Sequence, residues 1–165
     1  MQAVVIAGPK KSGKTTVLAL VAEALERLGK RVAVVKCSSH SLEKGNADAF
    51  WLMRPDRAVV NVSPEETVAF WPERLTFEAI LSHLDADVVL FEGGEAPVTV
   101  PRILCFREDE GPDESWLACE EGAYTVLAVF GAACPSTGDG VFFTAIDPVA
   151  AEKVASLILE KAQKI

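Results

Sequence analysis

The chain has 165 residues and a formal net charge of −8 at pH 7, and it is 50% hydrophobic and 24% charged. This acidic balance argues against nucleic acid as the main partner, because phosphate backbones require a basic face. No apolar run approaches the ~18 residues needed to span a bilayer, and the apolar start lacks the basic region of a signal peptide. We therefore predict a single domain over residues 1–165, located in the cytoplasm and without a membrane partner.

The first predicted elements are a strand, a glycine-rich loop and a helix. Residues 2–7 form a short, apolar, β-branched run that suits a buried strand. After the loop, four apolar residues recur at the spacing of one helical face: Val17, Val21, Leu25 and Leu28. Gly29 follows where a left-handed residue commonly ends a helix.

The loop between them, GPKKSGKTT at residues 8–16, fits the phosphate-loop pattern G-x-x-x-x-G-K-[ST] at every fixed position. Its glycines let backbone N–H groups converge on one anion, and the dipole of the following helix adds to the attraction. Lys14 is a candidate catalytic residue that would reach the outer phosphates, and the Thr15 hydroxyl would join the shell of a Mg²⁺ ion. The predicted nucleotide-binding residues are Gly8, Pro9, Lys10, Lys11, Ser12, Gly13, Lys14, Thr15 and Thr16.

Further along the chain, apolar strands alternate with helices in the manner of a parallel sheet. Residues 57–62 and 66–71 are two short strands, and the Ser-Pro-Glu sequence at 63–65 suits a hairpin turn. The other expected strands are 31–36, 87–92, 101–106 and 124–130, with helices at 76–84 and from Asp147-Pro148 onward and a loop with a short helix at 37–55. The pattern predicts an α/β three-layer fold of the P-loop NTPase kind, a mainly parallel sheet with a peripheral β-hairpin.

The segment DVVLFEGG at residues 87–94 is a second candidate for nucleotide chemistry. Glu92 ends a buried apolar run, and an acid at the end of a strand beside the first strand reaches Mg²⁺ through water or orients an attacking water. Ligands gather at the carboxyl ends of parallel strands, so we predict Glu92 to be a catalytic and metal-binding residue. Asp87 precedes the same strand, lies at the opposite edge of the sheet, and is predicted to be structural.

Two further features stay open. The segment 108–121 carries seven acidic residues and no basic one, which suits either a solvated loop or a docking surface for a basic partner. Cys37 and His40 have the spacing of two metal ligands, but no second pair of the kind that completes a zinc site follows them. Free thiols are therefore the expected state of the cysteines.

Several segments, in their order along the chain, carry a resemblance: GPKKSGKTT, VVKCSSH, NADAFW, RAVVNVSPEETVAF, DADVVLFEGG, PRILCF and DPVAAEKVASLI. Together they resemble the MobB family, the GTP-binding proteins of molybdopterin-guanine dinucleotide biosynthesis. The phosphate loop is shared with very many NTPases. Three other features are more specific to this family: the strand-ending lysine with a nearby histidine, the hairpin, and the EGG before PR. Cys37, Gly94 and Glu95 depart from the residues usual in that family.

The resemblance implies a GTP-binding, weakly hydrolysing accessory protein that assists the guanylyltransferase of molybdenum cofactor biosynthesis. It adds Asp48 to Thr15 and Glu92 as a candidate Mg²⁺ ligand, and it alone favours GTP over ATP, because no N-K-x-D guanine motif is evident. Two other classes remain open from the residues: a small-molecule P-loop kinase, and a regulatory module that only binds nucleotide.

The predicted hairpin at residues 57–71 also bears on assembly. It carries many apolar residues, although a two-stranded ribbon is marginal alone and an exposed apolar edge attracts another chain. Two-fold dimers are the commonest oligomers, and the resemblance points the same way. We therefore predict a homodimer through this hairpin.

Overall fold

The fold is described from a computed structural model covering residues 1–37, 57–93, 96–97, 99–107, 125–131, 140–162 and 164–165. The chain divides into two compact units, one formed by Met1–Cys37 with Leu84–Ile165 and the other by Ser38–His83. Each unit is described by itself, and the single domain over 1–165 stays a prediction. No helix in the described residues has the length and apolar character needed to cross a membrane.

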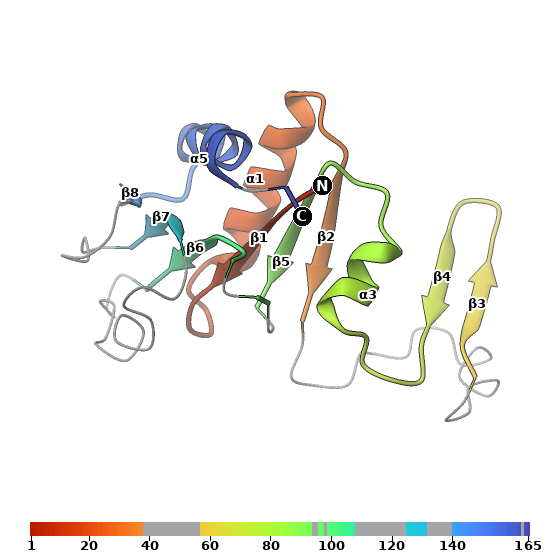
Figure 1. Ribbon diagram of the computed structural model, residues 1–165. Coiled ribbons are helices and arrows are strands. Elements are labelled where there is room, and N and C mark those ends of the chain that lie inside the picture. The colour runs from red at the N-terminus through yellow and green to blue at the C-terminus, as the bar shows by residue number, and fades with distance from the viewer. Residues whose placement is uncertain (38–56, 94–95, 98, 108–124, 132–139, 163) are drawn as a thin grey trace. The chain divides into compact units, whose positions relative to one another are not determined.

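The first unit is built on a six-stranded sheet with the order β2-β5-β1-β6-β7-β8 (Figure 1). Every pairing in this sheet is parallel. Its strands are β1 (Gln2–Ala7), β2 (Val32–Lys36), β5 (Val88–Glu92), β6 (Arg102–Cys105), β7 (Val126–Phe130) and β8 (Val141–Phe143). The parallel P-loop NTPase-like sheet predicted from the sequence is thus confirmed, and β5 lies directly beside β1.

Two helices, α1 (Lys14–Arg27) and α5 (Pro148–Lys161), lie side by side on one face of this sheet (Figure 1). Their apolar faces join the inward residues of the central strands in one core, which includes Val4, Ile6, Val21, Leu25, Leu90, Ile103, Val154 and Ile158. The alternate residues of β1 and β5, such as Val5 and Val89, are buried as well. Strands apolar on both faces are typical of a parallel sheet, and this explains the continuous hydrophobic runs in the sequence.

The helix ends follow local sequence signals. Gly29 adopts a φ of 75° just after α1, and the amide of Lys30 donates back to the Leu25 carbonyl, as expected for a left-handed helix stop. Leu28, predicted to lie on the apolar face, instead is the C-cap and is 53% exposed. At α5, the Asp147 carboxylate accepts a hydrogen bond from the amide of Ala150 at 2.8 Å.

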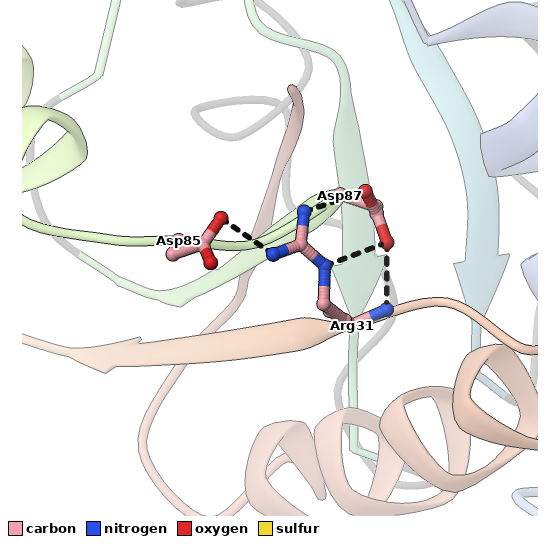
Figure 2. Close-up of polar contacts among 3 residues, drawn as sticks. All are labelled: Arg31, Asp85 and Asp87. Atoms are coloured by element: carbon pink, nitrogen blue, oxygen red, sulfur yellow. Dashed lines mark hydrogen bonds and ion pairs between the residues drawn. The ribbon is translucent and has the colours of Figure 1, made fainter.

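Asp87 stands at the amino-terminal edge of the sheet, where it binds Arg31 (Figure 2). Its Oδ2 accepts hydrogen bonds from the Arg31 backbone amide at 2.9 Å and from Nε at 3.4 Å, while Asp85 pairs with the same guanidinium. The guanidinium lowers the pKa of Asp87 below its ordinary value, first through the side-chain hydrogen bond. These contacts join the starts of β2 and β5, in agreement with the structural role predicted for Asp87.

The second unit contains a separate antiparallel sheet of β3 (Val59–Val62) and β4 (Thr67–Phe70), and the helix α3 (Phe77–Ser82). Ser63 forms the hairpin turn, because its Oγ accepts from the amides of Glu65 and Glu66. The register pairs Val60 with Ala69 and Val59 with Phe70. Directly opposed residues share a face, so Val60 and Val62 lie on one face of the ribbon and Phe70 on the other.

The sequence missed one strand, β8, which contributes only three residues to the sheet edge. Such a short run lacks the length on which periodicity depends. Several predictions lie outside the described residues: the loop and short helix of 38–55, and the acidic segment 108–121.

Candidate functional site

The phosphate loop connects the end of β1 to the start of α1, as the sequence predicts. Gly8 has a φ of 149°, and a Cβ at this position would lie 2.0 Å from the carbonyl oxygen of Cys105 in β6. Gly13 has a φ of 84°, and its Cβ would lie 2.5 Å from Cδ1 of Ile146. Gly8 is therefore required by close packing against backbone as well as by its own conformation. Gly13 is required mainly by its positive φ, because the Cδ1 atom it would meet is the end of a flexible side chain that can shift.

Lys11 is the one non-glycine residue with positive φ in the described chain, at 64°. An unfavourable left-handed residue persists where its surroundings enforce it, and such residues cluster at ligand sites. Together with Gly13 it gives the loop two left-handed positions, which suit an anion-binding concavity of backbone N–H groups.

The start of α1 is left available for an anion. Its N-cap is Gly13, which supplies no side-chain hydrogen bond, and the first turn contains no acidic residue. Unpaired amides and the positive end of the helix dipole therefore remain at this point. Lys14 adds a positive charge there, and its Nζ donates to the carbonyls of Gly8 at 3.0 Å and Pro9 at 2.6 Å. The ammonium of Lys14 therefore contacts the beginning of the loop, although Lys14 itself follows the end of the loop.

Thr15 and Glu92 come together, although 77 positions separate them in the chain. The Thr15 Oγ1 donates to Oε2 of Glu92 at 2.9 Å. Glu92 is only 9% exposed, because it ends the central strand β5 between β1 and β2. The two residues that the sequence assigned to a metal shell therefore offer their oxygens at one point beside the loop.

Lys36 is a member of this cluster that the sequence analysis left without a role. Its Nζ lies 3.3 Å from Oε2 of Glu92 and 3.5 Å from Oγ1 of Thr15. The signal for it was present in the sequence: a lysine ends the second strand, at the same edge of the sheet as Glu92. What the sequence lacked was the adjacency of β2 and β5, which pairs Lys36 directly with Glu92.

Cys105 lies next to the loop but is not a reactive group. Its thiol is buried, and burial raises its pKa to about 12, although the charge of Lys14 acts in the opposite direction. The group therefore stays a neutral thiol, and thiols in that state are poor nucleophiles and metal ligands. Cys105 is thus a core residue with a free thiol, the state expected of the cysteines from the sequence.

The other predicted binding residues differ in exposure. Lys10, Lys11 and Thr16 are exposed around the loop and helix start. Ser12 is 4% exposed, and its Oγ has no hydrogen-bond partner in the part of the chain that the structure describes. Its side chain therefore points into the protein, which leaves only its backbone for a ligand. Asp48 lies outside the described residues.

The residues at the site fit Mg²⁺. This ion prefers oxygen ligands and takes one or two from the protein while substrate phosphates and water supply the rest. A hydroxyl and a carboxylate 2.9 Å apart, already attracting the Lys36 ammonium, provide that environment. By contrast, no group of three or more His, Cys, Asp or Glu among the described residues forms a closed metal site.

Comparison with known proteins agrees with this geometry. Residues 3–131 match the family model described as "Molybdopterin guanine dinucleotide synthesis protein B", MobB. This chain belongs to the MobB family. Because the match covers most of the chain, including the loop, Lys36 and Glu92, it assigns the protein to nucleotide binding and molybdenum cofactor biosynthesis. No curated protein matches the sequence closely.

Solved MobB structures have the same fold. A molybdopterin-guanine biosynthesis protein B is 23% identical with a TM-score of 0.66, covering 96% of this chain and 97% of that one. MobB from Bacillus subtilis is 19% identical with a TM-score of 0.70, covering 95% and 98%. A MobB homologue from Bacillus stearothermophilus is 20% identical with a TM-score of 0.64, covering 97% of each chain. At these identities the likeness shows the fold alone.

Proposed function

We propose that this MobB-family protein binds GTP with Mg²⁺, hydrolyses it slowly, and serves in the cytoplasm as an accessory to the guanylyltransferase that attaches GMP to molybdopterin. The observation that carries the proposal is the juxtaposition of Thr15 and Glu92 beside a phosphate loop. The preference for GTP over ATP rests on the family.

The proposed roles follow from the positions of the side chains. Amides of the loop and of the first turn of α1 bind phosphate oxygens, and Lys14 exchanges its contacts with the Gly8 and Pro9 carbonyls for those oxygens. The Thr15 hydroxyl and the Glu92 carboxylate would hold the metal. When bound, Mg²⁺ neutralises charge that develops on the transferred phosphoryl group. Asp48 remains a further candidate for the same shell.

The decisive experiment compares the parent protein with Glu92→Gln. The amide keeps the size of the side chain but removes its charge, so nucleotide should still bind while Mg²⁺-dependent phosphate release falls by about 100-fold, a typical loss for one positioned catalytic group. Single-turnover release of phosphate from GTP measures the rate, and fluorescence of a labelled GTP measures binding. If Glu92→Gln hydrolyses at the parental rate, the catalytic assignment moves to Asp48 or elsewhere.

Nucleotide identity and the two rival classes are tested in parallel. GTP at 100 times its Kd should stabilise the protein by about 2.7 kcal/mol, and an equal concentration of ATP by much less. A kinase would release product only when a small-molecule acceptor is added. A regulatory module would bind GTP with the same stabilisation and release no phosphate.

We also propose that the protein is a homodimer through the β3–β4 hairpin. Val60 and Val62 share one face of the ribbon and are 60% and 70% exposed. Burial of this exposed apolar pair against a partner chain would stabilise the two-stranded ribbon. In a two-fold dimer, the same face of a second copy would contact it. The resemblance to the family supports the same assembly.

A further inference from the structure

Lys36 is built into the edge of the sheet that faces the phosphate loop. In the register of the parallel strands it is the partner of Glu92, which in turn is the partner of Ile6. Neighbouring residues in register project to the same face of a sheet. Lys36 and Glu92 therefore both extend toward α1, on the face where Ile6 joins the core. The side chain of Lys36 is 59% exposed, whereas that of Glu92 is 12% exposed.

The ammonium of Lys36 contacts the two oxygens that fit a metal. It lies 3.3 Å from Oε2 of Glu92, and it donates a hydrogen bond to Oγ1 of Thr15 at 3.5 Å. Thr15 still donates its own proton to the same carboxylate oxygen. A metal ion held by these two oxygens would compete with the Lys36 ammonium for both of them. We call the place beside this pair, within reach of both Thr15 Oγ1 and Glu92 Oε2, the cation position.

The contact between Lys36 and Glu92 pairs two opposite charges. Glu92 is a nearly buried carboxylate, which is costly to leave without a positive partner. Lysine suits such a temporary partner because its ammonium is a compact charge on a flexible stem. A divalent ion at the cation position would repel the ammonium strongly at such short range. Lys36 and Mg²⁺ therefore exclude one another from the carboxylate, while bound phosphate would offer the displaced lysine another anion.

We propose that Lys36 is a positioning residue that occupies the cation position in the nucleotide-free protein, and that it makes entry of Mg²⁺ depend on nucleotide. The proposal rests on the proposed Mg²⁺–nucleotide site and adds a residue and a regulatory consequence to it. Bare metal must break the Lys36–Glu92 pair with nothing to replace it. With a nucleoside triphosphate present, the lysine moves to phosphate oxygens, so metal and nucleotide bind cooperatively.

The test measures Mn²⁺ binding to the full chain by electron paramagnetic resonance, with and without the non-hydrolysable GTP analogue GppNHp. Lys36→Met keeps much of the side chain's length and removes its charge. It should bind Mn²⁺ without nucleotide at least tenfold more tightly than the parent, and should gain less affinity when GppNHp is added. Lys36→Arg keeps the charge and should behave as the parent does.

A matched control separates the local contact from net charge. Lys161→Met removes one positive charge from the last turn of α5, where the Lys161 side chain is exposed. The next residue, Ala162, accepts a hydrogen bond from the side chain of Gln2, so this position lies at the amino-terminal edge of the sheet. The Mn²⁺ affinity of Lys161→Met should equal that of the parent, and thermal melting should show that each variant is folded.

The possible results lead to distinct conclusions. If Lys36→Met binds Mn²⁺ no more tightly than the parent in the absence of nucleotide, the inference is wrong, although a parent that binds Mn²⁺ with GppNHp keeps the proposed function. If the parent binds neither GppNHp nor Mn²⁺ with it, both the inference and the proposed function fail. An equal gain in Lys161→Met would attribute the effect to net charge and overturn the role of Lys36.

Discussion

Replacement of Gly8 by alanine should disable the phosphate loop through a collision with the neighbouring strand. The added Cβ would lie 2.0 Å from the Cys105 carbonyl oxygen and 2.9 Å from Oγ of Ser12. A carbon and a carbonyl oxygen normally approach to about 3.3 Å, so the first contact is more than about 1 Å too short. Cys105 belongs to β6, which is paired on both sides, by β1 and β7. The loop must therefore move, since the strand cannot.

The expected size of the effect has two parts. Backbone strain at a φ of 149° costs an alanine about 1–3 kcal/mol, and overpacking adds about 1–3 kcal/mol. A loop displaced by about 1 Å also loses well-aligned hydrogen bonds to phosphate, each worth about 1.5–3 kcal/mol when the acceptor is charged. Loss of two such bonds weakens nucleotide binding by 100-fold or more, at about 1.4 kcal/mol per tenfold.

Gly29 provides the control for backbone strain alone. It also has a positive φ, of 75°, but nothing lies within 4 Å of the position a Cβ would take. Gly29→Ala should therefore cost only about 1–2 kcal/mol and leave nucleotide affinity unchanged. Urea unfolding gives the stabilities and titration with a fluorescent GTP analogue gives the affinities. A folded Gly8→Ala protein that binds nucleotide within threefold of the parent would refute the packing argument.

Three other changes test separate parts of the molecule. Lys14→Ala should abolish the stabilisation by saturating GTP, about 2.7 kcal/mol at 100 times Kd, while the nucleotide-free protein still melts cooperatively; parental affinity in a thermal-shift titration would contradict the phosphate-loop assignment. Asp87→Asn should lower the melting temperature at neutral pH, because it removes the charge that pairs with Arg31. The pKa of Asp87 is lower in the folded protein than its ordinary value of 3.8, so this carboxylate stabilises the fold at pH values above 3.8. That stabilisation is lost as the pH falls through the lower pKa of the folded protein. The difference from the parent should therefore shrink in melts below pH 3.8, and a constant difference would show that the charge of Arg31 is not responsible. Val60→Asp with Val62→Asp places two charges on one exposed face of the hairpin and should convert a dimer into a folded monomer in sedimentation; a monomeric parent, or a double variant that stays dimeric, would remove this face from the interface.

The sequence determined the elements that depend on local chemistry. The loop glycines, Lys14 and Thr15 were found from fixed spacing. The structure puts the glycines between β1 and α1 and the other two residues in the first turn of α1, because the flanking apolar patterns dictate both elements. Asp147 and Gly29 likewise marked helix ends, since capping and left-handed stops involve only nearby residues. The role of Asp87 also followed from its place before a strand.

Tertiary structure decided which of these residues meet. The order β2-β5-β1 brings Lys36, Glu92 and Thr15 to one point, and it is fixed by crossovers between segments more than fifty residues apart in the chain. The need for glycine at position 8 came partly from β6, whose carbonyl leaves no room for a side chain. The register of the hairpin separated Val60 from Phe70, although both belong to one apolar pattern in the sequence. Periodicity reports which face of its own element a residue occupies, but the neighbour across that face is chosen by long-range packing.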